Sequence, residues 1–298
     1  MRTLFLILLA LNLNAASLVL QSDFGLKDSA VAAMKGVAVA VDENIKIHDI
    51  THAIEPYDIW EGAYSLHKTA SYWPKGTVFV SVVDPGVGTE RPSIVLKTKS
   101  GHYFVSPDNG TLTLVAQHLG IDEVRRIDES KNRLSGSQKS YTFHGRDVYA
   151  YTGALLASGK IKYKDVGPKL ESKVYEIAYQ KARLEANTLI GNLPILDHHY
   201  GNVWSNIPDE LFEQLGGKKG DSFCAQISEK NETKWQGALP YVNSFGDVAE
   251  GEPLLYLNSL LNVSLALNMR NFSAENKVAA GADWSLKLWL PSEGKCAF

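Results

Sequence analysis

The feature that most constrains the fold of this chain is a run of apolar and β-branched residues over positions 78–83, in which Ser81 is the one polar side chain. Glycine and proline residues bound the run on both sides, which is typical of a strand buried on both faces. Asp84 stands at its carboxyl end, and Arg91 follows after a glycine-rich turn. Open α/β sheets bind ligands outside the carboxyl ends of their strands. The stretch therefore predicts a candidate active site, although Asp84-Pro85-Gly86 is equally typical of an ordinary turn.

Strand-like and helix-like segments alternate over the first half of the chain. The expected strands are Ser17–Gln21, Ile45–Ile50, residues 78–83 and a hairpin of Ser93–Thr98 with His102–Ser106; the expected helices are Ala30–Val41, Ile59–Tyr72, Thr111–Leu119 and Val148–Ser158. This alternation predicts an α/β domain, with a largely parallel sheet flanked by helices, over residues 17–185.

The pattern changes in the second half of the chain. Short β-like runs separated by turns predominate there, at Asn187–Leu196, Ser222–Ile227, Leu254–Leu257 and Val263–Leu267. They predict a smaller all-β, barrel-like C-terminal domain over residues 186–298.

Composition and the N-terminus bear on location and on partners. The net charge of −3 argues against a nucleic-acid-binding protein, which normally carries a basic surface.

The N-terminus has the features of a secretory signal peptide, here residues 1–16: Met1-Arg2, an apolar run over 3–13 and a small-residue site over 14–17. A bilayer span needs about 20 residues, so the mature form is expected to have no membrane segment. We expect export to the periplasm or the medium; without signal function the protein would be cytoplasmic.

The residues that commonly bind metals do not have metal-site spacing. Cys224 and Cys296 are the only cysteines, and they are either separate structural residues or one disulfide. His198 and His199 are adjacent, and adjacent strand residues point to opposite faces of a sheet. We therefore expect no metal site.

Five short motifs follow one another in a fixed order, and they carry a resemblance to a known family. They are Ser-Asp-Phe-Gly (22–25), Val-Asp-Pro-Gly-Val-Gly-Thr (83–89), Ser-Pro-Asp-Asn-Gly (106–110), Phe-His-Gly-Arg-Asp (143–147) and Gly-Asn-Val-Trp-Ser-Asn-Ile (201–207). Together they resemble the S-adenosylmethionine (SAM) hydrolases, or SAM hydroxide adenosyltransferases, which are related to the fluorinases and chlorinases. The resemblance spans residues 18–271.

The resemblance implies that water cleaves SAM at the ribose C5′, giving adenosine and L-methionine. SAM is then the substrate, and no cofactor is implied. Asp84, Arg91 and His144 match the catalytic residues of the family. His144 and Arg91 would orient the water and favour its hydroxide character, while Asp84 would fix Arg91 by a charge-assisted contact. A carboxylate at Asp84 would repel a halide ion, which disfavours halogenation.

The resemblance also assigns substrate-binding residues. It implies that Asp23 binds the ribose hydroxyls and that Asp197 binds the methionine ammonium. Asp28 either binds substrate or caps the following helix. The remaining matches are mostly aromatic or amide residues, which suit adenine and a sulfonium cation. They are Tyr57, Phe143, Tyr200, Asn202, Trp204 and Ser259. Trp204 is equally typical of a core residue.

The C-terminal end departs from the family pattern. Leu260-Leu261 stand where the family usually has a glycine, and residues 269–272 replace small residues. The resemblance therefore does not fix the contacts to adenine around Ser259. The substrate is either SAM or, as an alternative, another adenosyl compound. A second alternative is a SAM- or adenosine-binding protein without turnover. The resemblance finally implies a homotrimer with the ligand between subunits.

Overall fold

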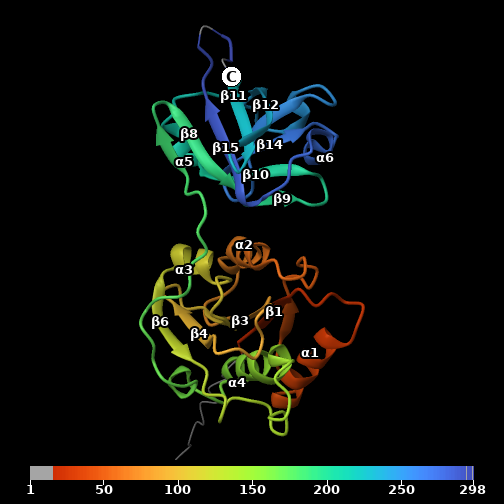
Figure 1. Ribbon diagram of the computed structural model, residues 1–298, viewed down its shortest axis with the longest axis vertical. Helices are drawn as coiled ribbons and strands as arrows, with labels where there is room; N and C mark the ends of the chain where they lie inside the picture. Colours follow the sequence, from red (N-terminus) through yellow and green to blue (C-terminus); the bar gives the residue numbers. More distant parts are fainter. Residues whose placement is uncertain (1–15, 293, 297) are drawn as a thin grey trace, which may run out of the picture. The chain divides into compact units, whose positions relative to one another are not determined.

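The computed structural model describes residues 16–292, 294–296 and 298 (Figure 1). These residues form two compact units, the first from 16–58 and 69–175, the second from 59–68 and 176–298. The sequence placed the boundary at residue 185, whereas 176–185 belong to the second unit, as do residues 59–68. Apart from Ala16, the predicted signal peptide lies outside the described residues.

The first unit is built on one six-stranded sheet with the order β2-β1-β3-β5-β4-β6. Its strands are β1 (Leu18–Ser22), β2 (Ile47–Asp49), β3 (Val78–Val82), β4 (Ser93–Thr98), β5 (Tyr103–Pro107) and β6 (Ile121–Arg126). Its helical segments are α1 (Ala30–Val41), α3 (Thr113–Leu119), the π-helical turn η1 (Gly145–Ala150), α4 (Tyr151–Ala157) and the short η2 (Tyr163–Asp165). Strands β2, β1, β3 and β5 are mutually parallel, so the predicted α/β fold with a largely parallel sheet is confirmed.

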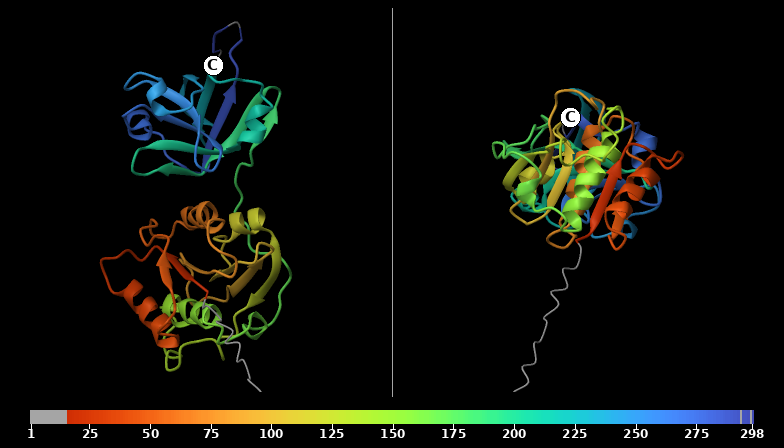
Figure 2. Two further views of the ribbon diagram at one scale, coloured as in Figure 1. Left: turned by 180° about the vertical axis from the view of Figure 1, so that it is seen from behind. Right: turned by 90° about the horizontal axis from the view of Figure 1, so that it is seen from below.

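Apolar burial explains why these segments form the sheet. Every residue of β1 and β3 is buried, as expected of central strands covered on both faces. Helices α1 and α4 lie side by side and pack against these strands, as Figures 1 and 2 show. The buried contacts come from strand residues Leu18, Leu20, Val78 and Val80 and helix residues Met34, Ala38, Ala150 and Ala154.

The hairpin of β4 and β5 is confirmed, but β6 was not expected from the sequence. It pairs antiparallel with β4 at the edge of the sheet. Its sequence, Ile-Asp-Glu-Val-Arg-Arg, contains four charged residues, and Val124 alone is buried in it. An edge strand needs few apolar residues, so it gives a weak sequence pattern.

The strand order places the candidate site. Strand β1 pairs with β2 on one side and with β3 on the other, so the chain changes direction across the sheet at β1. In open α/β sheets the carboxyl ends of the strands at such a reversal form the usual ligand crevice. Ser22 of β1 is in register with Val82 of β3. Asp23 and Asp84 therefore follow the two strands at this reversal.

The second unit contains two antiparallel sheets that share one core. Their orders are β13-β14-β10-β9 and β12-β11-β15-β8-β7. The strands are β7 (Arg183–Glu185), β8 (Thr188–Leu193), β9 (Ile195–Asp197), β10 (Asn202–Pro208), β11 (Ser222–Glu229), β12 (Glu232–Pro240), β13 (Pro253–Leu257), β14 (Asn262–Leu267) and β15 (Gly281–Trp289). The prediction of an all-β C-terminal domain is confirmed, with two sheets in place of a single barrel-like one.

Short helical segments complete the second unit. They are α2 (Ile59–Ala70, of which residues 59–68 belong here), α5 (Asp209–Glu213), the short η3 (Phe245–Asp247) and α6 (Phe272–Asn276). The indole N–H of Trp60 in α2 donates to the carbonyl of Pro194 at 2.9 Å. Glu61 of the same helix lies 3.3 Å from His198. These contacts attach α2 to the residues that flank β9.

A disulfide joins Cys224 of β11 to Cys296, so the single bridge left open by the sequence is formed. Within the described part of the chain, the search for a helix long and apolar enough to cross a membrane finds none. The same residues include no group of three or more His, Cys, Asp or Glu side chains suited to a metal ion.

Candidate active site

The centre of the site in the first unit is an ion pair of Asp84 and Arg91. The Asp84 side chain is 5% exposed, and its Oδ1 accepts from an Arg91 guanidinium nitrogen. The same oxygen lies 3.1 Å from the backbone nitrogen of Gly86 and accepts from it. Asp84 thus combines both roles predicted for it, a turn contact and a charge pair. The buried Nε of Arg91 has no hydrogen-bond partner among the described residues.

Tyr149 extends this ion pair, and the sequence did not single it out. Its hydroxyl lies 3.4 Å from the second carboxylate oxygen of Asp84, while Ser93 donates to the same hydroxyl at 3.1 Å. Burial raises the pKa of Tyr149 to about 12, so the phenol keeps its proton and donates to Asp84. Tyr149 lies in η1, and π-helical turns are frequent at functional sites. That location, directly after the Phe-His-Gly-Arg-Asp motif, was the only signal that could have indicated it.

His144, directly before η1, is the third predicted catalytic residue and is 5% exposed. Its Nδ1 lies 3.1 Å from the carbonyl oxygen of Tyr141. Because a carbonyl only accepts, this nitrogen carries a proton, and the other nitrogen is left as the basic one. Its ring centre lies 6.4 Å from that of Tyr149. The structure therefore brings Asp84, Arg91 and His144 into one cluster, with Tyr149 between the ion pair and the imidazole.

The close approach of Arg91 requires a glycine at position 86. A Cβ built on Gly86 would lie 2.5 Å from a terminal guanidinium nitrogen of Arg91. We expect Gly86→Ala to displace this side chain and to reduce kcat about tenfold or more, since a misplaced catalytic group costs more than its contact energy. The melting temperature should change little, because a flexible side-chain end moves rather than backbone. Steady-state kinetics with thermal melts check this; an unaltered kcat would contradict it. Gly36→Ala, with open space around its Cβ, is the matched control.

Of the predicted binding residues of the first unit, Asp23 and Asp28 lie after β1, Tyr57 lies after β2, and Phe143 lies shortly before η1. The Oδ2 atom of Asp23 accepts from the backbone N–H of Tyr57 at 2.9 Å. Tyr57 has a positive φ of 72° and is 69% exposed, so its ring is presented outward from the Asp23 carboxylate. Phe143 packs edge-to-face on Phe24 with ring centres 5.9 Å apart. Asp28 accepts from the Ala30 N–H at 2.8 Å, so the capping role that the sequence allowed for it is present.

A buried hydrogen-bonded chain supports the Asp23 loop. The hydroxyl of Ser22 lies 2.7 Å from His52 Nδ1, and His52 Nε2 lies 3.1 Å from Asp49. The carbonyl of His52 accepts from Gly25 N–H at 2.7 Å. Burial lowers the pKa of His52, with Asp49 opposing the effect. The sequence predicted a structural role for His52. In the structure His52 contacts Ser22 and Gly25, which lie on either side of Asp23 in the chain.

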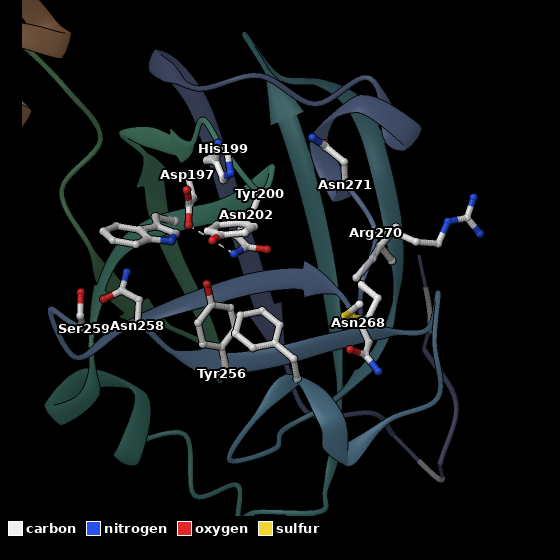
Figure 3. A pocket seen from close by; sticks show the side chains of 14 residues that line it. Asp197, His199, Tyr200, Asn202, Tyr256, Asn258, Ser259, Asn268, Arg270 and Asn271 are labelled. Atoms are coloured by element: carbon white, nitrogen blue, oxygen red, sulfur yellow. Dashed lines mark hydrogen bonds between the residues drawn. The ribbon is translucent and has the colours of Figure 1, made fainter.

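The second unit contains a separate pocket of about 760 Å³ (Figure 3). It gathers every binding residue predicted for this unit and adds others from the strands and the C-terminal segment. The lining residues are Asp197, His199, Tyr200, Asn202, Trp204, Phe245, Tyr256, Asn258, Ser259, Leu267, Asn268, Met269, Arg270 and Asn271. Trp204, for which the sequence left core and ligand roles open, lies in the lining.

Polar and aromatic groups face each other in this pocket. The Asn202 amide nitrogen lies 3.5 Å from an oxygen of Asp197, and Figure 3 shows both pointing into the pocket. Phe245 and Tyr256 pack with ring centres 5.0 Å apart. Burial raises the pKa of Tyr256 to about 12, and the Asp197 charge contributes, so this phenol stays a donor. The sequence missed Tyr256, because an aromatic residue in a strand-like segment is more often core, and Phe245, which lies in the short η3.

The segment that departs from the family pattern lies on the pocket. Met269 is 83% exposed, and Figure 3 shows Arg270 directed away from the Asp197 side of the pocket. The guanidinium of Arg270 pairs with Glu275 at 2.8 Å. Leu261 is 56% exposed at a positive φ of 60°. The larger residues Met269 and Arg270, which stand where the family usually has small ones, line the pocket without filling it.

The fold and these side chains define a two-unit protein: an α/β unit with an acid–guanidinium pair at its sheet reversal, and an antiparallel β unit with an aromatic ligand pocket. Comparison with known sequences specifies the family. Residues 18–167 match the SAM hydroxide adenosyltransferase N-terminal domain, and residues 191–285 match the C-terminal domain of the same family. The chain belongs to this family, as its motifs indicated.

Individual relatives agree with this placement. The chain is similar to the (R)-S-adenosyl-L-methionine hydrolase of Methanocaldococcus jannaschii, 47% identical over 71% of this chain and 73% of the relative. It is 28% identical to a fluorinase of an Actinoplanes species, over 87% of this chain and 93% of the relative. Among solved structures, an uncharacterised conserved protein from Thermotoga maritima has a TM-score of 0.84 and 33% identity, over 91% of this chain and 99% of that one.

Proposed function

We propose that this protein is a SAM hydrolase that forms adenosine and L-methionine. The observation that carries the proposal is the part-buried Asp84–Arg91 ion pair clustered with His144 at the sheet reversal. Membership of the SAM hydroxide adenosyltransferase family and 47% identity to a relative named as an (R)-SAM hydrolase support it. The negative charge of Asp84 disfavours a bound halide, which separates this site from fluorination chemistry.

The reaction is a displacement at the ribose C5′. The oxygen of water forms a bond to C5′, the C5′–S bond breaks, and its electron pair goes to sulfur. The sulfonium becomes a neutral thioether, so the leaving group needs no acid. One proton from the water is released. The protein therefore has to place and deprotonate the water rather than activate the leaving group.

The side chains divide these tasks. Arg91 offers its buried Nε–H to the attacking oxygen, and His144 accepts the proton at the nitrogen that does not face Tyr141. Asp84 fixes the guanidinium, and Tyr149 and Gly86 fix Asp84. Because these contacts exist before substrate binds, the site is preorganised for the developing charge.

Substrate binding uses both units. Asp23, with two carboxylate oxygens, binds the ribose hydroxyls, and Asp197 binds the methionine ammonium. The aromatic lining of the pocket suits adenine and the sulfonium, by stacking and cation–π attraction. Asn202 and Ser259 supply further polar contacts.

The test is incubation of the purified protein with the (R) and (S) sulfonium forms of SAM, followed by chromatography for adenosine and methionine. Equimolar adenosine and methionine, absent with His144→Ala, are expected. Retention of SAM without products would support the binding-protein alternative. Turnover of another adenosyl sulfonium in preference to SAM would support the alternative substrate.

The family resemblance also leads us to propose a homotrimer with each site shared between subunits. Asp84, Arg91 and His144 belong to the first unit and Asp197 to the second, and the family resemblance assigns roles to all four. Asp84→Ala and Asp197→Ala should each be inactive. If sites form between neighbouring chains, mixing the two variants in equal amounts under exchange should recover about a quarter of wild-type activity. No recovery, or a monomer in light scattering, would contradict the shared site.

We further propose that the protein is exported. Residues 1–16 have signal-peptide character, and the Cys224–Cys296 disulfide is of a kind that persists in oxidising compartments. Fractionation of the native cells, with mass spectrometry of the mature N-terminus, tests this. Full-length protein in the cytoplasmic fraction with free thiols would refute it.

A further inference from the structure

We propose that Glu129 is a positioning residue for His144: its carboxylate stabilises the imidazolium formed when His144 takes the proton of the attacking water, and conveys that proton to solvent. This inference rests on the proposed hydrolysis, because it concerns the proton that the reaction releases.

The hydrogen bonds of His144 restrict where a proton can be taken up. Nδ1 is the donor to the Tyr141 carbonyl, so Nε2 is the ring nitrogen that can accept. Nε2 lies 3.6 Å from Glu129 Oε2. At this separation a carboxylate favours the imidazolium over the neutral ring. Glu129 thus faces the atom at which the charge develops.

Arg133 holds both partners of His144. Its side chain is 4% exposed and pairs with Glu129 at 2.8 Å. It also donates to the carbonyl of Ser140 at 2.6 Å, and its guanidinium lies 4.6 Å from the centre of the Tyr141 ring. One buried cation therefore fixes the carboxylate opposite Nε2 and the segment whose carbonyl accepts from Nδ1. Its bonds to Ser137 and Ser140 do not involve Glu129, so the loop keeps an anchor when Glu129 is replaced.

The exposure of Glu129 completes the path. The Asp84 side chain is 5% exposed and that of His144 6%, whereas that of Glu129 is 35% exposed. A proton on His144 Nε2 therefore has one neighbouring carboxylate, and that carboxylate contacts water.

The charged and titratable groups around His144 predict the direction of the pH effect. Glu129 is the anion at Nε2, with Arg133 behind it; the Tyr141 and Tyr149 rings flank the imidazole at 6.0 and 6.4 Å. Glu129→Gln removes the negative charge 3.6 Å from Nε2, and with it the attraction to a positive charge on the ring. Since the neutral ring is the active base, the acid limb of the kcat profile moves to lower pH.

The experiment compares the pH profiles of kcat and KM for wild type, Glu129→Gln and Glu129→Asp with SAM. For Glu129→Gln we expect the plateau kcat to fall about tenfold, with KM unchanged, as a part of the general-base contribution. The acid limb should move down by roughly half a pH unit, the size of a partly exposed charge contact. Glu129→Asp should restore the position of the limb. Glu171→Gln removes an exposed carboxylate, with its side chain 73% exposed, and is the matched control.

A second measurement does not depend on turnover. Histidine-labelled NMR without substrate, assigned with His144→Gln, should show the Nδ1–H tautomer and a downward shift of the ring titration in Glu129→Gln. A kcat profile of Glu129→Gln that superimposes on that of wild type, or falls equally at every pH, would overturn the inference while leaving the hydrolase proposal intact. A wild type that forms no adenosine refutes hydrolysis and the proton path with it, and the NMR arm then reports on the contact alone.

Discussion

Replacing Asp84 by alanine is expected to reduce kcat for SAM hydrolysis about a thousandfold, the size of effect seen when one preorganised electrostatic group is removed from an active site. Without the carboxylate, the Arg91 guanidinium loses its ion-pair partner and its fixed direction. Tyr149 and the Gly86 N–H lose their acceptor at the same time. The KM for SAM should change much less, because Asp84 orients the nucleophile and does not bind the substrate. Chromatographic assay of adenosine under saturating SAM measures both constants.

Asp84→Asn separates charge from shape. Asparagine keeps the size of the side chain and an oxygen for the Gly86 N–H, but it cannot form an ion pair with Arg91. We expect a loss of kcat of about a hundredfold. Asp122→Asn, which removes a 47% exposed carboxylate on β6, is the control and should leave the kinetics unaltered. If Asp84→Asn has wild-type kcat, the negative charge is not needed, and the argument against halide binding fails with it.

Removing the Cys224–Cys296 disulfide is expected to cause the largest loss of stability. The bridge closes a chain segment with a sequence separation of 72, for which the loss of unfolded-state entropy corresponds to about 4 kcal/mol. For a unit of this size that free energy lowers the melting temperature by roughly 10 °C. The paired variant Cys224→Ala with Cys296→Ala, measured by thermal melts, gives the value. Activity per folded molecule should persist, because neither cysteine lines the pocket.

Reduction of the wild type supplies the matched control. A thiol reductant should lower the melting temperature of the wild type toward that of the paired variant and leave the variant unaffected. The same melting temperature for wild type with and without reductant would mean either that the bridge is not formed or that it does not limit unfolding. Thiol counting on the denatured protein distinguishes these two cases.

Several features were predictable because they depend on local sequence. Strand β3 is recognisable since a run of six residues with five apolar side chains, followed by Pro85-Gly86, has few alternatives to a buried strand. The Asp84 and Asp23 carboxylates follow such strands directly. Their location at the same edge of the sheet was therefore predictable once a parallel sheet was assumed. By contrast, β6 and β12 each bury a single residue, and a strand without an apolar pattern has no local signature.

The sequence by itself thus determined the fold class, the sheet edge that carries the reactive residues and the family, because apolar periodicity and short motifs are properties of neighbouring residues. Only the tertiary structure decided the partners of those residues. Tyr149 reaches Asp84 across 65 positions, and Cys224 reaches Cys296 across 72. Glu129 meets His144 through a loop that the buried Arg133 holds in place. Such contacts depend on the path of the whole chain and on which side chains are buried from solvent when it packs. No local sequence pattern specifies either of these.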